Sequence, residues 1–252
     1  MLILAIGDIV GKPGRKAVSR VLPDLRRQYG INLVIANGEN AAGGIGLTPE
    51  TARELLDAGT DVITSGNHIW AQKEIFPYLE GQMPIVRPLN YPPGVPGRGY
   101  MVIGQVAVVN IMGRTFIGNF DCPFQAMDKL LGKLKQPIII VDFHAEATSE
   151  KVAMGRYLDG RVSAVLGTHT HVGTIDTQIL RGGTAYVSDI GMTGPIDSVI
   201  GDDADAVIQR FLTGIHYRLS VGKGKSALNA VMVDVDDTGR AKSIERIYRE
   251  VD

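Results

Sequence analysis

The fold of this chain is indicated by the stretch Val62-Ile63-Thr64-Ser65-Gly66-Asn67-His68, in which a short apolar run ends in an amide and an imidazole. Such a run is typical of a buried strand, so Asn67 and His68 are predicted to lie on a strand-to-helix loop. In that position the amide oxygen can bind a metal ion and the imidazole can donate a proton. A Gly-Asn-His loop is more often a plain turn, so this interpretation depends on the other strand ends.

Four further apolar runs end in polar side chains in the same way. Asp8 follows residues 2–7, Glu39 and Asn40 follow residues 33–36, His144 follows residues 138–141, and His169 and His171 follow residues 162–166. Ligands of open α/β sheets bind outside the carboxyl ends of the strands, so these five strand ends predict one shared site. Residues two apart in an extended chain point to the same face, so His169 and His171 can both address it.

Composition excludes several classes of protein. With 252 residues and no linker or composition break, the chain is predicted to form a single domain over residues 1–252. A formal net charge of -1 gives no general attraction to a long nucleic acid or to a membrane, so neither is expected as a partner. The apolar start is too short and lacks the basic flank of a signal peptide, and a single cysteine, Cys122, fits a reducing compartment. We therefore expect a cytoplasmic protein.

Strands and helices alternate along most of the chain, which predicts an α/β fold. Helices are expected near residues 14–29, 48–58, 124–134, 148–158 and 203–212, and further strands near residues 161–166 and 185–188. Hairpins are expected at residues 100–111 and 227–248, the second turning at residues 236–239. The antiparallel strands of the tail suggest a second sheet.

The glycine-rich loop at residues 7–14 resembles a phosphate-binding loop of nucleoside triphosphatases. It is one residue short of that pattern, and Pro13 stands where a serine or threonine should bind magnesium. A nucleoside triphosphatase is therefore disfavoured.

The polar strand ends together supply oxygen and imidazole ligands without a thiolate. The predicted metal ligands are Asp8, Glu39, Asn40, Asn67, His144, His169 and His171. This set is large enough for two divalent ions if one carboxylate bridges them, and it suits manganese, iron or magnesium, with zinc as an alternative. Two metals roughly 3.5 to 4 Å apart can clamp a phosphoryl group during in-line displacement, which is phosphoester hydrolysis. His68, which is assigned to no metal, can protonate the departing alkoxide.

The motifs also resemble those of a known superfamily. Gly7-Asp8, Gly66-Asn67-His68, His144 and the run GTHTH at residues 167–171 look, in this order, like the motifs of calcineurin-like metallophosphoesterases. Within that superfamily, the runs GDIVGKPGR at 7–15, NGENAAGG at 37–44 and GMTGP at 191–195 resemble the YmdB-like bacterial 2′,3′-cyclic-nucleotide 2′-phosphodiesterases. The resemblance covers nearly the whole chain. It implies a four-layer α-β-β-α sandwich, a dinuclear iron or manganese centre, activity on cyclic nucleotides and simple phosphodiesters through a metal-bridged hydroxide, and a homo-oligomer.

The chain departs from the common superfamily pattern at two strand ends. Val10 stands where the first strand usually provides a histidine, and Glu39 with Asn40 replaces the usual bridging aspartate. The YmdB-like branch shares this change. The resemblance then implies that one metal binds Asp8, Glu39, Asn40 and His171, and that the other binds Glu39, Asn67, His144 and His169.

Two alternative functions are less consistent with the sequence. A metal-dependent amidohydrolase also uses His-x-His, but its motif should lie near the amino end of an eightfold barrel that cannot be drawn here. A nucleotide sensor without turnover should have lost a ligand or His68, and none is lost.

Three further residues, Lys12, Arg87 and Tyr91, are predicted to lie near enough to touch substrate. His216 is expected to be structural.

Overall fold

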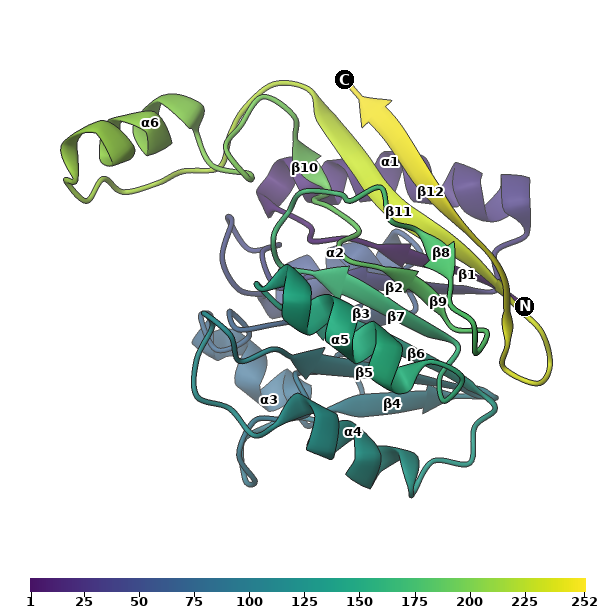
Figure 1. The fold of residues 1–252 in the computed structure, drawn as a ribbon. Coiled ribbons are helices and arrows are strands. Elements are labelled where there is room, and N and C mark those ends of the chain that lie inside the picture. Colours follow the sequence, from purple (N-terminus) through teal and green to yellow (C-terminus); the bar gives the residue numbers. More distant parts are fainter.

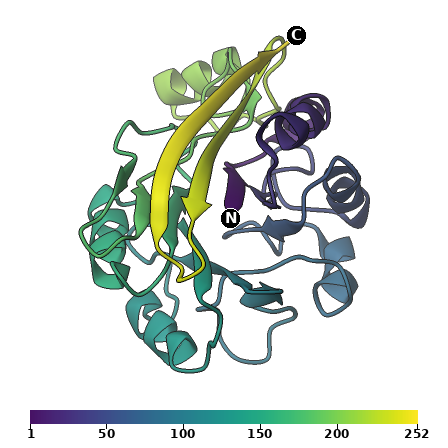
Figure 2. The ribbon, with the colours of Figure 1, turned by 90° about the vertical axis from the view of Figure 1, so that its right-hand side faces the viewer.

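The computed structural model describes all 252 residues and places two β-sheets face to face, each covered on its outer side by helices (Figures 1 and 2). The first sheet has the order β10-β11-β1-β2-β3, with β12 paired to β11. Its strands are β1 (Leu2–Ile6), β2 (Leu33–Asn37), β3 (Val62–Thr64), β10 (Gly194–Pro195), β11 (Ser226–Val235) and β12 (Ala241–Val251). β1, β2 and β3 are parallel, whereas β11 runs antiparallel to β1.

The second sheet has the order β4-β5-β6-β7-β9-β8. Its strands are β4 (Tyr100–Ile103), β5 (Val106–Met112), β6 (Ile138–His144), β7 (Ala164–Thr168), β8 (Gln178–Ile179) and β9 (Ala185–Val187). β5, β6, β7 and β9 are parallel, and the edge strands β4 and β8 are antiparallel to their neighbours. The hairpin predicted at residues 100–111 is the β4–β5 pair.

Helices cover the outer faces of both sheets. The first sheet is covered by α1 (Gly11–Tyr29), α2 (Pro49–Asp57), η1 (Lys73–Ile75) and α3 (Phe76–Leu79), and the second by α4 (Pro123–Leu131) and α5 (Thr148–Leu158). The Thr48 hydroxyl accepts a hydrogen bond from the Thr51 backbone N–H at 3.3 Å and so caps α2, as its sequence predicts. The remaining helix, α6 (Ala204–Thr213), stands away from the sheets (Figure 1).

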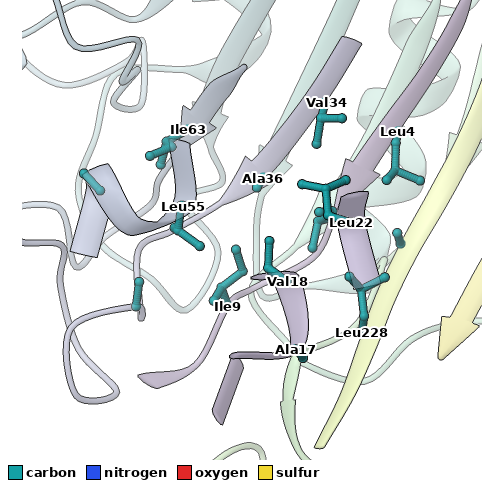
Figure 3. Close-up of a cluster of buried hydrophobic side chains, with 14 of the residues drawn as sticks. Leu4, Ile9, Ala17, Val18, Leu22, Val34, Ala36, Leu55, Ile63 and Leu228 are labelled. Carbon is teal, nitrogen blue, oxygen red and sulfur yellow. The ribbon is translucent and has the colours of Figure 1, made fainter. Parts of the chain in front are cut away.

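The central strands are apolar on both faces because both faces are buried. In β1, Leu4 and Ile6 pack under α1 and α2 (Figure 3 shows part of this cluster), whereas Ile3 and Ala5 point toward the second sheet. The second sheet meets them with alternate residues of its own strands, including Ile140 of β6. Alternate residues of each sheet therefore face the other sheet or the sheet's own helices. This gives three apolar core layers between four layers of secondary structure. The predicted four-layer α/β sandwich is confirmed.

The sequence prediction for the tail was wrong in one respect. The β11–β12 hairpin does not build a second sheet but extends the first, because β11 pairs with β1 in the register Ile3↔Val233. This pairing covers an edge of β1 that would otherwise expose unpaired backbone groups. The strand predicted at 161–166 begins later, at Ala164, and continues to Thr168. Two separate sheets also exclude the barrel of a metal-dependent amidohydrolase. No helix combines the length and the apolar character needed to cross a bilayer.

The layer between the sheets should dominate stability. Ile140 is 1% exposed within this layer, whereas Ile175 on a surface loop is 90% exposed. Ile140→Ala should lower the free energy of unfolding by about 2 to 5 kcal/mol, because it leaves a cavity between two sheets that cannot close around it. The matched change Ile175→Ala should cost less than about 0.5 kcal/mol. Urea denaturation measures both, and similar losses in the two variants would contradict the assignment of this core.

Candidate metal centre

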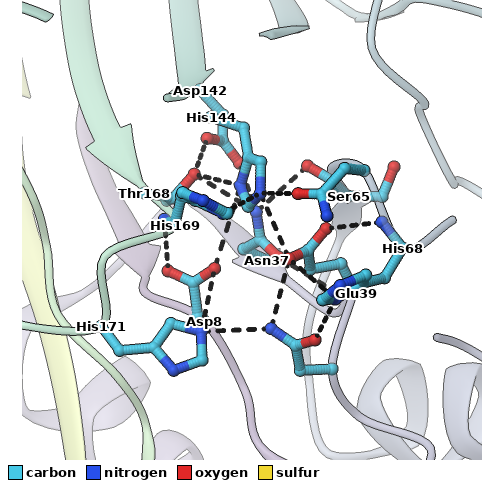
Figure 4. A network of polar contacts seen from close by, with 12 residues as sticks. Asp8, Asn37, Glu39, Ser65, His68, Asp142, His144, Thr168, His169 and His171 are labelled. Atoms are coloured by element: carbon cyan, nitrogen blue, oxygen red, sulfur yellow. Dashed lines mark hydrogen bonds and ion pairs between the residues drawn. The ribbon is translucent and has the colours of Figure 1, made fainter. Parts of the chain in front are cut away.

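Five strand ends from the two sheets converge on one side of the sandwich. Asp8 follows β1, Glu39 and Asn40 follow β2, and Asn67 and His68 follow β3, all in the first sheet. In the second sheet His144 ends β6, and His169 and His171 follow β7. Figure 4 shows the resulting cluster of carboxylates and imidazoles. The structure therefore brings together the seven predicted metal ligands and His68.

His144 lies at the centre of the cluster. Its Nε2 is 3.2 Å from Glu39 Oε1, 3.0 Å from Asn67 Oδ1 and 2.9 Å from His169 Nδ1. One ligand atom from each of Glu39, His144 and His169 lies within 4.8 Å of the other two. Asp8 Oδ1 lies 3.9 Å from the other ring nitrogen of His144 and 3.8 Å from His171 Nε2. Glu39, His144 and His169 lie close enough together to share a metal ion.

The outer nitrogens of His169 and His171 are bound by hydrogen-bond partners outside the cluster. His171 Nδ1 is 2.6 Å from the Ile200 carbonyl oxygen, which can only accept, so this nitrogen carries the proton. His169 Nε2 is 3.1 Å from a carboxylate oxygen of Glu146. In each ring the opposite nitrogen then turns its lone pair toward the cluster, which is how metal-binding histidines are usually oriented.

His144 is oriented by a buried chain of polar groups. Its Nδ1 is 3.0 Å from the Thr168 hydroxyl, which donates to Asp142 Oδ1 at 2.7 Å. The Asn37 amide donates to the other Asp142 oxygen at 3.1 Å. Burial raises the pKa of Asp142 to about 6, although the nearby His144 and the Thr168 hydroxyl act in the opposite direction.

The cluster requires positive charge at its centre. Asp8 Oδ1 is buried and has no hydrogen-bond donor, and the inward atoms of Glu39 and Asn67 are acceptors as well. Burial alone would lower the pKa of His144, but the Glu39 and Asp8 carboxylates outweigh it and raise that pKa to about 9. Burial alone would raise the pKa of Glu39, but His144 and His68 hold it at about 2. In the protein alone a proton on His144 supplies the missing charge, and the same donor set suits a divalent cation.

The pKa values of two other candidate ligands, His169 and Asp8, are shifted in opposite directions by burial. Burial, followed by the charge of His144, lowers the pKa of His169 to about 3, which leaves this ring neutral and able to ligate. Burial raises the pKa of Asp8, and His171 and His144 oppose that shift. His169 and Asp8 are also joined directly, because the His169 backbone N–H donates a hydrogen bond to Asp8 Oδ2 at 3.1 Å.

Asn40 and His68 form a pair at the edge of the cluster. His68 Nδ1 is 2.8 Å from Asn40 Oδ1, while Asn40 Nδ2 faces Glu39 Oε1 and His171 Nε2, each at 3.2 Å. Ligation through the Asn40 oxygen therefore requires its amide to turn over, so its role as a ligand stays a prediction. The His68 side chain is 35% exposed, against 0% for His144, 20% for His169 and 11% for His171. His68 is thus the imidazole that faces solvent.

The loop that carries His169 and His171 has an unusual backbone. The two histidines have φ angles of 99° and 65°, so the extended conformation assumed from the sequence is wrong, although both rings still reach the site. Left-handed conformations of non-glycine residues cost about 1 to 3 kcal/mol each and need support from their surroundings. Asp189 provides that support by accepting hydrogen bonds from the Thr170 backbone and hydroxyl at 3.0 and 2.7 Å. Asp189 is in turn paired at 2.6 Å with the buried Lys151, which also donates to the Thr168 carbonyl at 2.8 Å.

Sequence reasoning missed this supporting set. Asp142, Thr168 and Asn37 lie inside or at the end of buried strands, and Lys151 lies on the buried side of α5. The available signal was a charged or hydroxyl residue within a run that is otherwise apolar. Such a residue is buried only if it has a partner.

The three residues predicted to contact substrate, Lys12, Arg87 and Tyr91, lie in three different surroundings. Lys12 is exposed and lines a surface depression beside the carboxyl terminus. Arg87 is tied to its own loop, donating to the Pro88 carbonyl at 2.8 Å and the Pro96 carbonyl at 3.2 Å. Tyr91 packs against Trp70 and Phe120, and burial raises its pKa to about 12 with Glu39 contributing. Contact with substrate stays a prediction for all three. His216 is exposed beyond α6, away from the cluster.

Comparison with known proteins identifies the family. The family model described as YmdB-like protein matches residues 4–247. The chain belongs to the YmdB-like family. A relative from Bacillus subtilis (strain 168), the 2′,3′-cyclic-nucleotide 2′-phosphodiesterase, is 48% identical over 98% of this chain and 96% of its own length. The expected resemblance to this family is confirmed.

Two solved structures of similar proteins share the fold of this YmdB-like chain. A hypothetical protein from Thermus thermophilus is 47% identical, with a TM-score of 0.94 over 99% of each chain. A novel phosphatase from Mycoplasma pneumoniae is 34% identical, with a TM-score of 0.94 over 99% of this chain and 93% of the other. The two-sheet architecture is therefore one that a phosphatase also has.

Gly66 should be indispensable to the centre of this YmdB-like protein. A Cβ atom at this position would overlap both Glu39 Oε2 and His144 Nε2. Gly66→Ala should therefore push both groups apart and weaken metal binding strongly. Gly132→Ala is the matched control, because its added Cβ would come no closer than 3.7 Å to another atom and its φ is −63°. Metal content after dialysis against a defined metal buffer measures the effect, and unchanged metal content in Gly66→Ala would contradict the packing described.

Proposed function

We propose that this phosphoric ester hydrolase cleaves 2′,3′-cyclic nucleotides to 3′-phosphates, and simple phosphodiesters as well, at a centre of two divalent metal ions. The proposal draws on the name of the Bacillus subtilis relative, a 2′,3′-cyclic-nucleotide 2′-phosphodiesterase. The observation that carries it is the set of inward acceptor atoms around His144, with one exposed imidazole, His68, at the rim.

The residues at the strand ends would hold the two ions. Asp8, Glu39, Asn40 and His171 would bind one, and Glu39, Asn67, His144 and His169 the other, with Glu39 shared. Iron or manganese best suits this mixture of carboxylate, amide and imidazole ligands, with magnesium or zinc as alternatives. When bound, such a pair supplies Lewis-acid stabilisation of the phosphoryl oxygens and lowers the pKa of water.

His68 would supply the proton for the leaving group. Hydrolysis adds the oxygen of water to phosphorus and breaks the bond from phosphorus to the ribose 2′-oxygen, which must take up a proton. Asn40 holds the His68 ring through Nδ1, and the His68 backbone N–H donates to Glu39 Oε2 at 3.1 Å, so the exposed ring has a fixed direction. In this proposal His68 protonates the 2′-oxygen, the position that the name of the Bacillus subtilis relative indicates, and the phosphate stays on the 3′-oxygen.

The proposal includes the location, the substrate and the assembly of the protein. We expect a cytoplasmic protein that acts on small cyclic nucleotides and forms a homo-oligomer, as the family resemblance implies. A nucleotide sensor without turnover would have no use for a partly exposed imidazole beside the predicted ligands, so hydrolysis is the better explanation of His68.

Glu39 should be the ligand whose loss costs most. Because its carboxylate is shared in the proposed centre, Glu39→Ala should remove both metals, whereas His144→Ala should mainly weaken one site. Elemental analysis of the purified variants gives metals per chain. A Glu39→Ala protein that still holds two metals per chain would refute the bridging role.

The role of His68 can be separated from metal binding by varying the leaving group. His68→Ala should lower turnover of a 2′,3′-cyclic nucleotide by about 10²- to 10⁴-fold, the usual value of general acid catalysis, while both metals stay bound. A nitrophenolate departs without a proton, so the defect on an aryl phosphodiester should be far smaller. Equal defects on the two substrates, or loss of metal, would show that His68 is a ligand or a structural residue.

A further inference from the structure

A second cavity lies at the β4 edge of the second sheet, between α4, the start of β4 and the loop at residues 87–93 (Figure 1). Its volume is about 540 Å³, which is within the range of about 300 to 1,000 Å³ that is usual for small-molecule sites. Neither His68 nor any predicted metal ligand lines it, so it is separate from the metal centre. We call it the α4 cavity.

The lining of the α4 cavity carries an excess of positive charge. Arg87, Lys129 and Lys133 line it, and none of the three takes part in an ion pair. Lys129 and Lys133 are four residues apart on one side of α4, and Asp121 is the only acidic residue of the lining. On a chain whose net charge is -1, such a concave cationic surface favours an anionic ligand.

Arg87 is held in place without being neutralised. Its Nε donates to the Pro96 carbonyl at 3.2 Å and its Nη1 to the Pro88 carbonyl at 2.8 Å, while Nη2 makes no hydrogen bond to the protein. Burial lowers the pKa of Arg87, and a bound anion would offset this cost of burying the charge. A planar guanidinium fixed in this way suits the paired oxygens of a phosphate group.

The rest of the lining offers flat and apolar surface. Tyr91 and Tyr100 line the α4 cavity together with leucines and prolines. Tyr91 is fixed by edge-on contacts with Trp70 and Phe120, whose ring centroids are 5.3 and 5.1 Å from its own. Tyr100 is 37% exposed. Nucleobases stack readily on tyrosine rings, because every base has an aromatic face.

We propose that the α4 cavity binds a mononucleotide, with its phosphate at Arg87, Lys129 and Lys133 and its base against Tyr91 and Tyr100. Inorganic phosphate alone would leave the tyrosine surface uncovered, and an uncharged ring would leave three cations without a partner. A mononucleotide satisfies both halves of the lining. The inference does not depend on the proposed hydrolysis, and its failure would leave that proposal standing.

Cys122 can report occupancy, because it lines the α4 cavity, is partly exposed and is the only cysteine of the chain. Its modification by N-ethylmaleimide, a neutral reagent, is followed by mass spectrometry. Adenosine 5′-monophosphate (AMP) at about ten times its dissociation constant should slow this reaction about tenfold, because it fills about nine cavities in ten. Failure of AMP to protect Cys122 would overturn the proposal.

Binding at the metal centre is separated from binding in the α4 cavity by the variant Glu39→Ala. Glu39 belongs to the metal cluster and does not line the cavity, so this variant should bind AMP as tightly as the wild type does. Isothermal titration calorimetry measures its dissociation constant independently of the thiol. Absence of binding to Glu39→Ala would show that AMP occupies the metal centre only, which would overturn the proposal.

The phosphate half is tested by reversing charge on α4. In Lys129→Glu/Lys133→Glu the phosphate meets two carboxylates, so the AMP concentration that half-protects Cys122 should rise at least about tenfold. Lys73→Glu/Lys135→Glu is the matched control, because it changes the net charge equally at two exposed lysines outside the cavity, and it should behave as the wild type. Circular dichroism checks that both variants are folded. Equal losses in the two variants would overturn the assignment of the phosphate to the cavity.

The two halves of the ligand can also be supplied apart. Ribose 5-phosphate lacks the base and adenosine lacks the phosphate, so each should protect Cys122 at least about tenfold less effectively than AMP. Ribose 5-phosphate as effective as AMP would show an anion site with no place for a base. Adenosine as effective as AMP would show an apolar pocket with no place for a phosphate. Either result would overturn the assignment to a mononucleotide.

Discussion

Acceptor atoms that face one another across the sandwich are the constraint on which the rest of this structure depends. The inward nitrogen of His144 meets a Glu39 oxygen at 3.2 Å and an Asn67 oxygen at 3.0 Å, and Asp8 brings a buried oxygen with no donor. Groups of this kind are costly to bury unless a positive charge lies among them. The raised pKa of His144 and the lowered pKa of Glu39 are the response of the protein alone to that demand. A divalent cation meets it more completely, because several acceptors can share one ion.

The supporting groups keep these acceptors from relaxing apart. Thr168 and Asp142 hold one face of His144, and the buried Lys151–Asp189 pair fixes the loop after β7. A buried ion pair adds little net stability of its own, but breaking it by removing one partner typically costs about 3 to 5 kcal/mol. We therefore interpret the Lys151–Asp189 pair as a contact that fixes the loop after β7 rather than one that adds net stability. Through Thr170 it supports a backbone in which two histidines have left-handed conformations.

Much of this cluster was predictable because its polar residues follow apolar runs. Asp8, Glu39 and His144 were found at strand ends because a polar residue that ends a buried run is conspicuous in sequence. The Asp142 carboxylate was missed because it lies within such a run, and nothing local reveals that Thr168 and Asn37 lie beside it. The partner of β1 was also missed, since the pairing of Ile3 with Val233 is a contact between distant parts of the chain. The helix near residues 203–212 was predicted, and most of its apolar residues are exposed.

The two sheets contribute different chemistry to the centre. The first sheet supplies the predicted oxygen ligands, from Asp8 to Asn67, and the second supplies three imidazoles, from His144 to His171. Neither sheet alone presents a complete set, so the site exists only where the layer between the sheets packs correctly. A cation held by both sets would then join the sheets at one edge, as the apolar layer joins them along their length. Binding that favours the folded state in this way also stabilises it, so the metal would be part of what keeps the sandwich closed.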